Sequence, residues 1–163
     1  MEEPGDGDER SVLLGWLAFH RGVLAAKCAG LSATELVAAS LPPSRLTLLG
    51  LVRHLTEMER VYGVTALGRA GTPTFVYGEY EDGGPEWDFD VDESMVDESF
   101  ANWKREQAAL DLLLQRHESL DVAGTRNGRS VGWNLQKLVG EYARHNGHAD
   151  MLREQIDGAT GEI

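Results

Sequence analysis

The stretch VGEYARHNGHADML, residues 139–152, decides the fold of this chain, because apolar and ionisable residues share one face of a single helix. Steps of three and four residues return to nearly the same direction on a helix. One stripe of this helix therefore consists of Leu138, Glu141, His145, Ala149 and Leu152. A carboxylate in an apolar interior costs several kcal/mol unless it is protonated, paired or bound to a metal ion. Glu141 thus indicates a polar site inside a helical core.

The same periodicity, followed outward from this stretch, predicts four long helices. They cover residues 11–29, 44–68, about 90–118 and 130–158. Residues 1–10 lack large apolar side chains and are expected to form a flexible tail, whereas residues 11–163 form one domain. The fold class is all-α: a four-helix bundle with one short extra helix and a long acidic connection between helices 2 and 3.

Capping residues mark where these helices begin and end. The sequence SATE, residues 32–35, has the form of a capping box and predicts the short extra helix. Asp90 with Glu93 can cap the third long helix, and Ser130 can cap the fourth. Gly158 is suited to stop the fourth helix, because glycine readily adopts the left-handed backbone conformation.

The connection between the second and third long helices, residues 69–91, is rich in Gly and Pro. It includes one short candidate extended segment, TFVYG, at residues 74–78. Half of the residues from 79 to 98 are acidic. A calcium-binding EF-hand loop begun at Asp88 would need Gly at its sixth position, where Glu93 stands. We therefore interpret this stretch as a solvated acidic loop.

Composition excludes several classes of function. Lys and Arg total 15 against 27 Asp and Glu, and the resulting net charge of -12 argues against binding to nucleic acid. No apolar run approaches the roughly 20 residues that a membrane-spanning helix needs. The first residues, MEEPGDGDER, do not resemble a secretory signal, and a single cysteine cannot form an internal disulfide. A cytoplasmic protein without membrane or nucleic-acid partners is expected.

A second helix supplies another polar group to the predicted core. Its inward stripe consists of Leu51, His54, Leu55, Met58 and Val61. Two helix faces thus present His54, Glu141 and His145 to one another. Three nitrogen and oxygen ligands suit a divalent ion such as Zn²⁺ or Ni²⁺ and leave a coordination position open for water or substrate.

Each of these residues also has a simpler interpretation. His54 alone is more often a hydrogen-bonded core histidine than a ligand. Glu141 could form an ion pair with Arg144 or Arg60 instead of binding a metal ion. His148 could replace Glu141 as a ligand, but it lies about 60° around the helix from His145, against about 40° for Glu141. We place His148 beside the metal site or at the pocket rim, together with Arg144.

The remaining candidates are assigned no catalytic role. Cys28 lies near the end of an apolar helix and is expected to be an inert, semi-buried thiol. His20 could face the mouth of the pocket or serve a structural role. The aromatic residues are expected in the core or in the contact of a possible homodimer, and include Trp16, Trp87, Trp103, Trp133, Phe19 and Tyr62.

Two segments, LTLLGLVRHLTEMERVY and EYARHNGHADMLREQIDGATGE, resemble the DinB-like superfamily, in its branch known as the domain of unknown function 664. The resemblance covers nearly the whole chain and implies a four-helix bundle with a metal ion between helices two and four. The positions that match the superfamily's ligands are His54, Glu141 and His145. Many members carry His at the position of Glu141, whereas the related mycothiol-dependent maleylpyruvate isomerases carry Glu.

The resemblance also implies a function. Related families transfer mycothiol, bacillithiol or glutathione to electrophiles, or use the thiol in an isomerisation. A divalent-metal-dependent enzyme that uses a low-molecular-weight thiol of the mycothiol type on small-molecule substrates is therefore the first hypothesis. The alternative is a non-catalytic metal-binding bundle that binds a small ligand or a partner.

Overall fold

The computed structural model describes residues 2–68, 75–77, 90–117, 119–124 and 126–161. Its α-helices are α1 (Glu9–Cys28), α2 (Ala33–Leu36), α3 (Leu48–Met58), α4 (Val96–Leu114) and α5 (Val131–Asp157). A π-helix, η1 (Glu59–Thr65), continues α3, and a 3-10 turn, η3 (Glu93–Met95), precedes α4. No strand occurs in the described part of the chain, so the expected all-α fold is confirmed.

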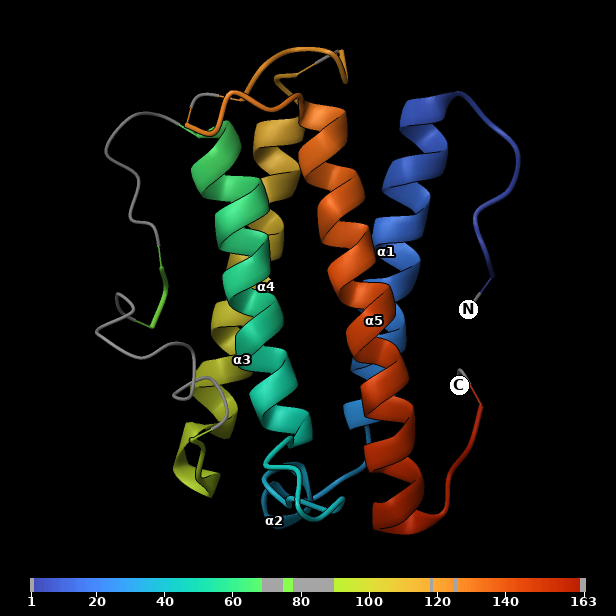
Figure 1. Ribbon diagram of the computed structural model, residues 1–163, viewed down its shortest axis with the longest axis vertical. Coiled ribbons are helices and arrows are strands. Elements are labelled where there is room, and N and C mark those ends of the chain that lie inside the picture. Colours follow the sequence, from blue (N-terminus) through green and yellow to red (C-terminus); the bar gives the residue numbers. More distant parts are fainter. Residues whose placement is uncertain (1, 69–74, 78–89, 118, 125, 162–163) are drawn as a thin grey trace.

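The four long helices lie side by side, with the short α2 at one end of the bundle (Figure 1). The most extensive contacts are those of α1 with α5 and of α3 with α4. Leucines from all four long helices fill the centre without exposure to solvent, among them Leu24, Leu51, Leu110 and Leu138. Among the described residues, the search for a helix that is both long and apolar enough to cross a membrane finds none.

Several predicted helix boundaries are confirmed. Ser32 and Glu35 form both hydrogen bonds of the capping box at the start of α2. The Ser130 side chain accepts a hydrogen bond from the backbone N–H of Trp133 at the start of α5. Gly158 ends α5 with φ of 79°, in the left-handed region that favours glycine.

Other boundaries differ from the expectation. Helix α1 begins at Glu9 rather than Ser11, because the Asp8 side chain caps it by accepting from the backbone N–H of Ser11. The cap expected at Asp90 is provided by Asp92, whose carboxylate accepts from the backbone N–H of Ser94. Helix α4 ends at Leu114, four residues before the expected end, and a turn follows it.

Of the connection between the second and third long helices, residues 69–91, the structure describes only residues 75–77 and 90–91, and none of them forms a strand. The buried carboxylate of Glu57 accepts hydrogen bonds from the backbone N–H groups of Val76 and Tyr77, at 2.8 to 3.0 Å. The Arg53 guanidinium lies 3.8 Å from the centre of the Tyr77 ring. Two side chains of α3 therefore anchor this segment; most of the predicted acidic loop, including Trp87, lies outside the described residues.

The π-helical turn lies where the second long helix approaches α4. A Cβ atom at Gly63 would lie 2.7 Å from a methyl carbon of Leu110. Such a contact is much shorter than van der Waals distance, so glycine permits the close approach of the two helices. This long helix ends at Leu67, one residue before Gly68, near which its sequence periodicity predicts the end.

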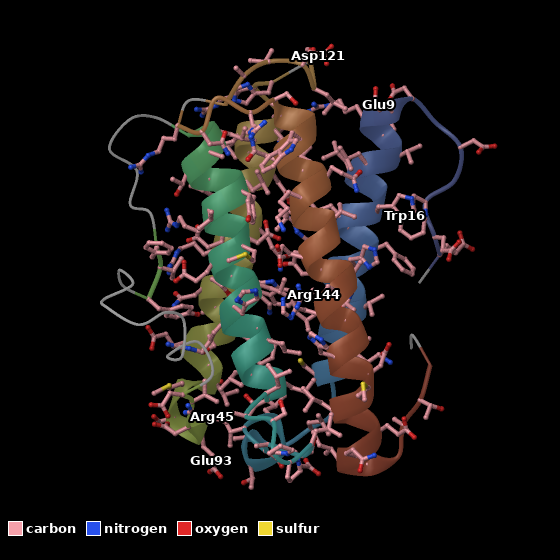
Figure 2. The ribbon with its side chains drawn as sticks, viewed as in Figure 1. Glu9, Trp16, Arg45, Glu93, Asp121 and Arg144 are labelled. Atoms are coloured by element: carbon pink, nitrogen blue, oxygen red, sulfur yellow. The ribbon has the colours of Figure 1, made fainter. Side chains whose placement is uncertain are left out.

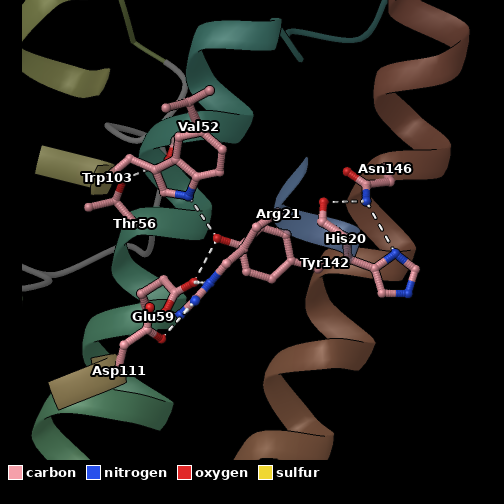
Figure 3. Close-up of polar contacts among 9 residues, drawn as sticks. All are labelled: His20, Arg21, Val52, Thr56, Glu59, Trp103, Asp111, Tyr142 and Asn146. Carbon is pink, nitrogen blue, oxygen red and sulfur yellow. Dashed lines mark hydrogen bonds and ion pairs between the residues drawn. The ribbon is translucent and has the colours of Figure 1, made fainter. Parts of the chain in front are cut away.

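A buried polar network joins all four long helices (Figure 3). Arg21 donates to both carboxylate oxygens of Glu59 at 2.7 Å, and it donates to Asp111 at 2.9 Å. The Tyr142 hydroxyl donates to Glu59 at 2.8 Å and accepts from the Trp103 indole N–H at 2.7 Å. The fully buried Glu59 carboxylate is therefore surrounded by donors from α1 and α5.

This network keeps a charge pair in the core. Burial alone lowers the pKa of Arg21, but the hydrogen bonds and the negative charge of Glu59 outweigh it, so the pKa rises above its ordinary value. Arg21 is therefore positively charged near neutral pH. Loss of one partner from a buried pair is strongly destabilising, because the other charge remains in the core without compensation.

Glu59→Gln is expected to lower the free energy of unfolding by about 3 kcal/mol, since it removes the buried counter-charge of Arg21 and leaves only the exposed carboxylate of Asp111 beside it. Urea unfolding followed by circular dichroism measures this change. The exposed Glu154 on α5 is the matched control, and Glu154→Gln is expected to change stability by less than about 0.5 kcal/mol. Equal effects of the two substitutions would show that the network does not stabilise the fold.

Candidate metal centre

Three of the residues singled out from the sequence lie together in the structure. His54 comes from α3, and Glu141 and His145 come from α5. One possible ligand atom from each of the three lies within 4.8 Å of the other two. Glu141 Oε2 is 3.7 Å from His145 Nε2 and 4.0 Å from His54 Nε2. The cluster is thus formed by two facing helices, as the inward stripes predict.

The three side chains fit a divalent ion by their chemistry and their spacing. Zinc bonds to nitrogen and oxygen are about 2.0 to 2.2 Å long, so neighbouring ligands around a tetrahedral ion are roughly 3.3 to 3.6 Å apart. The two measured separations from Glu141 exceed this by only a few tenths of an ångström. Two imidazoles and one carboxylate also suit the ligand preferences of Zn²⁺ and Ni²⁺.

Lys137 fixes the orientation of the Glu141 carboxylate. Its ammonium group donates to Oε1 at 2.5 Å, whereas Oε2 is the oxygen nearest to both imidazoles. Burial raises the pKa of the Glu141 carboxyl, but the hydrogen bond and charge of Lys137 outweigh burial and lower it below its ordinary value. The carboxylate is therefore ionised near neutral pH, with one oxygen directed toward the two histidines.

The ion-pair alternatives considered for Glu141 were Arg144 and Arg60. The structure instead pairs Glu141 with Lys137, one helical turn earlier on the same helix. Arg60 bonds to the buried Glu106 of α4 at 2.8 Å. Lys137 could have been found from the sequence, because a Lys four residues from a Glu is a common helical ion pair.

His145 is held in the form that can bind a metal ion. Burial, assisted by the neighbouring imidazoles of His54 and His148, lowers the pKa of His145 to about 4. The ring is therefore neutral near pH 7. Its Nε2 faces Glu141, while its Nδ1 lies 3.3 Å from Nδ1 of His148. His148 thus contacts the nitrogen of His145 that points away from the cluster.

His20 lies in the seam between α1 and α5. The Asn146 amide donates to the His20 backbone carbonyl at 3.0 Å and lies 3.4 Å from the His20 Nδ1 (Figure 3). The His20 ring also packs near the rings of Trp16 and Phe19. The structure therefore places His20 against Asn146, the residue that follows His145 on α5.

Two hollows lie along α5, and Glu141 of the candidate centre lines the first of them. The first, of about 360 Å³, is called the Gly140 hollow and is lined by Trp133, Gln136, Lys137, Gly140, Glu141 and Arg144. The second, of about 520 Å³, is called the Trp16 groove and lies between α1 and α5. Trp133 and Gln136 line both hollows. Figure 2 shows Arg144 about halfway along the bundle and Trp16 on α1.

The sequence interpretation missed the network around Glu59. A signal was present, since Glu59 follows Leu55 by four residues and Arg21 follows Leu17 by four. Both charged residues thus lie on the apolar stripes of their helices. Their partnership spans 38 positions in the sequence, so helical spacing alone does not reveal it.

A comparison with protein families gives one match. The family model described as Mycothiol-S-transferase matches residues 12–158, a range that includes all four long helices except the first residues of α1. His54, Glu141 and His145 all lie within the matched range. Searches of curated proteins and of solved structures found no significant match.

Cys28 is expected to resist modification in the folded protein. Burial raises the pKa of its thiol to about 12, so the reactive thiolate is nearly absent at pH 8. Reaction with Ellman's reagent should be at least about tenfold slower in buffer than after unfolding in guanidinium. Equal rates in the two conditions would mean that Cys28 is accessible in the native state.

Proposed function

The chain belongs to the mycothiol S-transferase family, and on this basis we propose that it is a metal-dependent enzyme that transfers a low-molecular-weight thiol to small electrophiles. The observation that carries the proposal is the convergence of His54, Glu141 and His145 on one point between two helices. Three protein ligands leave a divalent ion coordinatively open, which distinguishes a catalytic site from a closed structural one.

The family match is the basis for proposing a thiol, and the cluster of His54, Glu141 and His145 is the basis for proposing a metal ion. A divalent ion at the centre would stabilise the thiolate over the thiol near neutral pH. In the transfer, the thiol sulfur loses its proton to solvent and forms a bond to the electrophilic carbon. Either a leaving group departs with its bonding electron pair, or a conjugated double bond is opened and its far carbon takes up a proton.

The residues around the centre serve this chemistry in different ways. Lys137 holds one oxygen of Glu141 and thereby presents the other to the two imidazoles. His145 is neutral, so one of its ring nitrogens carries a lone pair, and in the tautomer with the proton on Nδ1 this lone pair is on Nε2. The Gly140 hollow and the Trp16 groove offer adjoining surfaces for the two organic reactants.

The purified protein is expected to bind about one divalent ion per chain through His54, Glu141 and His145. His54→Ala and His145→Ala should each remove most of the metal, because either change leaves only two ligands. His148→Ala is the control and should retain it, since His148 meets His145 on the opposite ring nitrogen. Elemental analysis measures the metal content per chain of each variant. Loss of metal in His148→Ala, but not in Glu141→Ala, would identify His148 as the third ligand.

The thiol is expected to reach the metal ion. Co²⁺-substituted protein titrated with mycothiol, bacillithiol and glutathione should show a thiolate charge-transfer band in the near ultraviolet for the thiol that is used. The same thiol should be consumed with the uncharged electrophile monochlorobimane, and a chelator should stop the reaction. If no thiol perturbs the spectrum and none is consumed, the chain is instead a metal-binding bundle for another small ligand.

A further inference from the structure

The Gly140 hollow lies over the backbone of Gly140 and is bordered by long side chains, including those of Lys137 and Arg144. A Cβ atom at Gly140 would meet nothing within 4 Å, so the space above this residue is open. Lys137 lies three residues before Gly140 and Arg144 lies four residues after it, so both share its face of the helix. Both side chains line the hollow.

The charges around the hollow are unusual for this protein. The chain carries a net charge of -12, yet two of the six residues that line the hollow are cations. Its single carboxylate, Glu141, is already bonded to Lys137 and faces the candidate metal centre. Arg144 forms no ion pair with the described residues. With a divalent ion on Glu141, the hollow would be strongly positive and would attract an anion.

The hollow also has an aromatic wall. The Trp133 side chain makes an edge contact with Tyr62, with 6.3 Å between the two ring centres. The Arg129 guanidinium lies over the Trp133 ring, 5.2 Å from the centre of that ring. Trp133 nevertheless remains 43% exposed. An indole that is held in place and partly exposed provides a surface for stacking of a planar group.

We propose that the Gly140 hollow is the binding site for the electrophilic acceptor, and that this acceptor is a planar organic anion. Its carboxylate lies over Gly140 between Lys137 and Arg144, and its aromatic or conjugated body packs against Trp133. Glu141 lines the same hollow, so an acceptor held in this way lies beside the thiol site. The assignment of the bound anion as the acceptor rests on the proposed thiol transfer, whereas the binding itself does not require that reaction.

The probes are trans-cinnamate, a planar carboxylate, and cinnamamide, its uncharged analogue of nearly the same shape. Each is titrated into the isotope-labelled protein, with zinc and after treatment with a chelator, and binding is followed by nuclear magnetic resonance. Cinnamate is expected to bind at least about tenfold more tightly than cinnamamide, in both states of the protein. Arg144→Gln should weaken the binding of cinnamate about tenfold and leave that of cinnamamide nearly unchanged.

Two glycines of α5 provide a matched pair of variants. Gly140→Leu places a side chain in the hollow and should abolish cinnamate binding. Gly147→Leu places the same side chain at an equally open position outside the hollow and should bind like the wild type. Both replace a helical glycine by a better helix former, so neither should unfold the protein. Thermal unfolding checks this.

The outcomes separate this inference from the proposed function. Equal affinities for the two probes, an unchanged affinity in Gly140→Leu, or equal losses in the two leucine variants would overturn the anion site. Binding that disappears with the chelator would place the carboxylate on the metal ion and would overturn it as well. Failure of thiol consumption both with monochlorobimane and with an electrophilic planar carboxylate, 4-chloro-3-nitrobenzoate, would refute the transferase and would leave the binding result standing.

Discussion

The rest of the structure depends on the buried ion pair between Arg21 of α1 and Glu59 of η1. Its hydrogen bonds extend through Tyr142 to α5, through Trp103 to α4, and from Arg21 to Asp111, also on α4. Apolar side chains can pack in many similar arrangements, whereas a buried charge pair is satisfied in few. The network thus restricts how the four helices can rotate relative to one another.

This restriction also positions the candidate metal centre. Tyr142 and Glu141 are neighbours on α5 and point about 100° apart around the helix axis. When the Tyr142 hydroxyl bonds to Glu59, the adjacent Glu141 faces α3, where His54 lies. Asn146, which follows His145, is bonded to His20 of α1 on another side of the same helix. Contacts on either side therefore fix the rotation of α5 at the level of the cluster.

The fully buried carboxylate of Glu59 and the partly exposed carboxylate of Glu141 have contrasting surroundings. Both oxygens of Glu59 are bonded to donors of the protein, so its charge is already balanced. Glu141 has one oxygen bonded to Lys137, and the other faces two imidazoles, of which His145 is neutral near pH 7. The first arrangement holds helices together, and the second suits a divalent ion. Cys28, the only cysteine, is buried away from this chemistry, so sulfur chemistry at the centre would need a thiol from outside the chain.

The sequence by itself determined the four helices, the caps at Ser32 and Ser130, the stop at Gly158, and the inward direction of His54, Glu141 and His145. These features depend on spacing over a few residues, which the regular helix converts directly into a face or an end. Only the tertiary structure decided that Arg21 pairs with Glu59, that the second long helix contains a π-helical turn, and which residues border the Gly140 hollow. Those features depend on how helices distant in sequence rotate and pack against one another, and local periodicity does not specify that rotation.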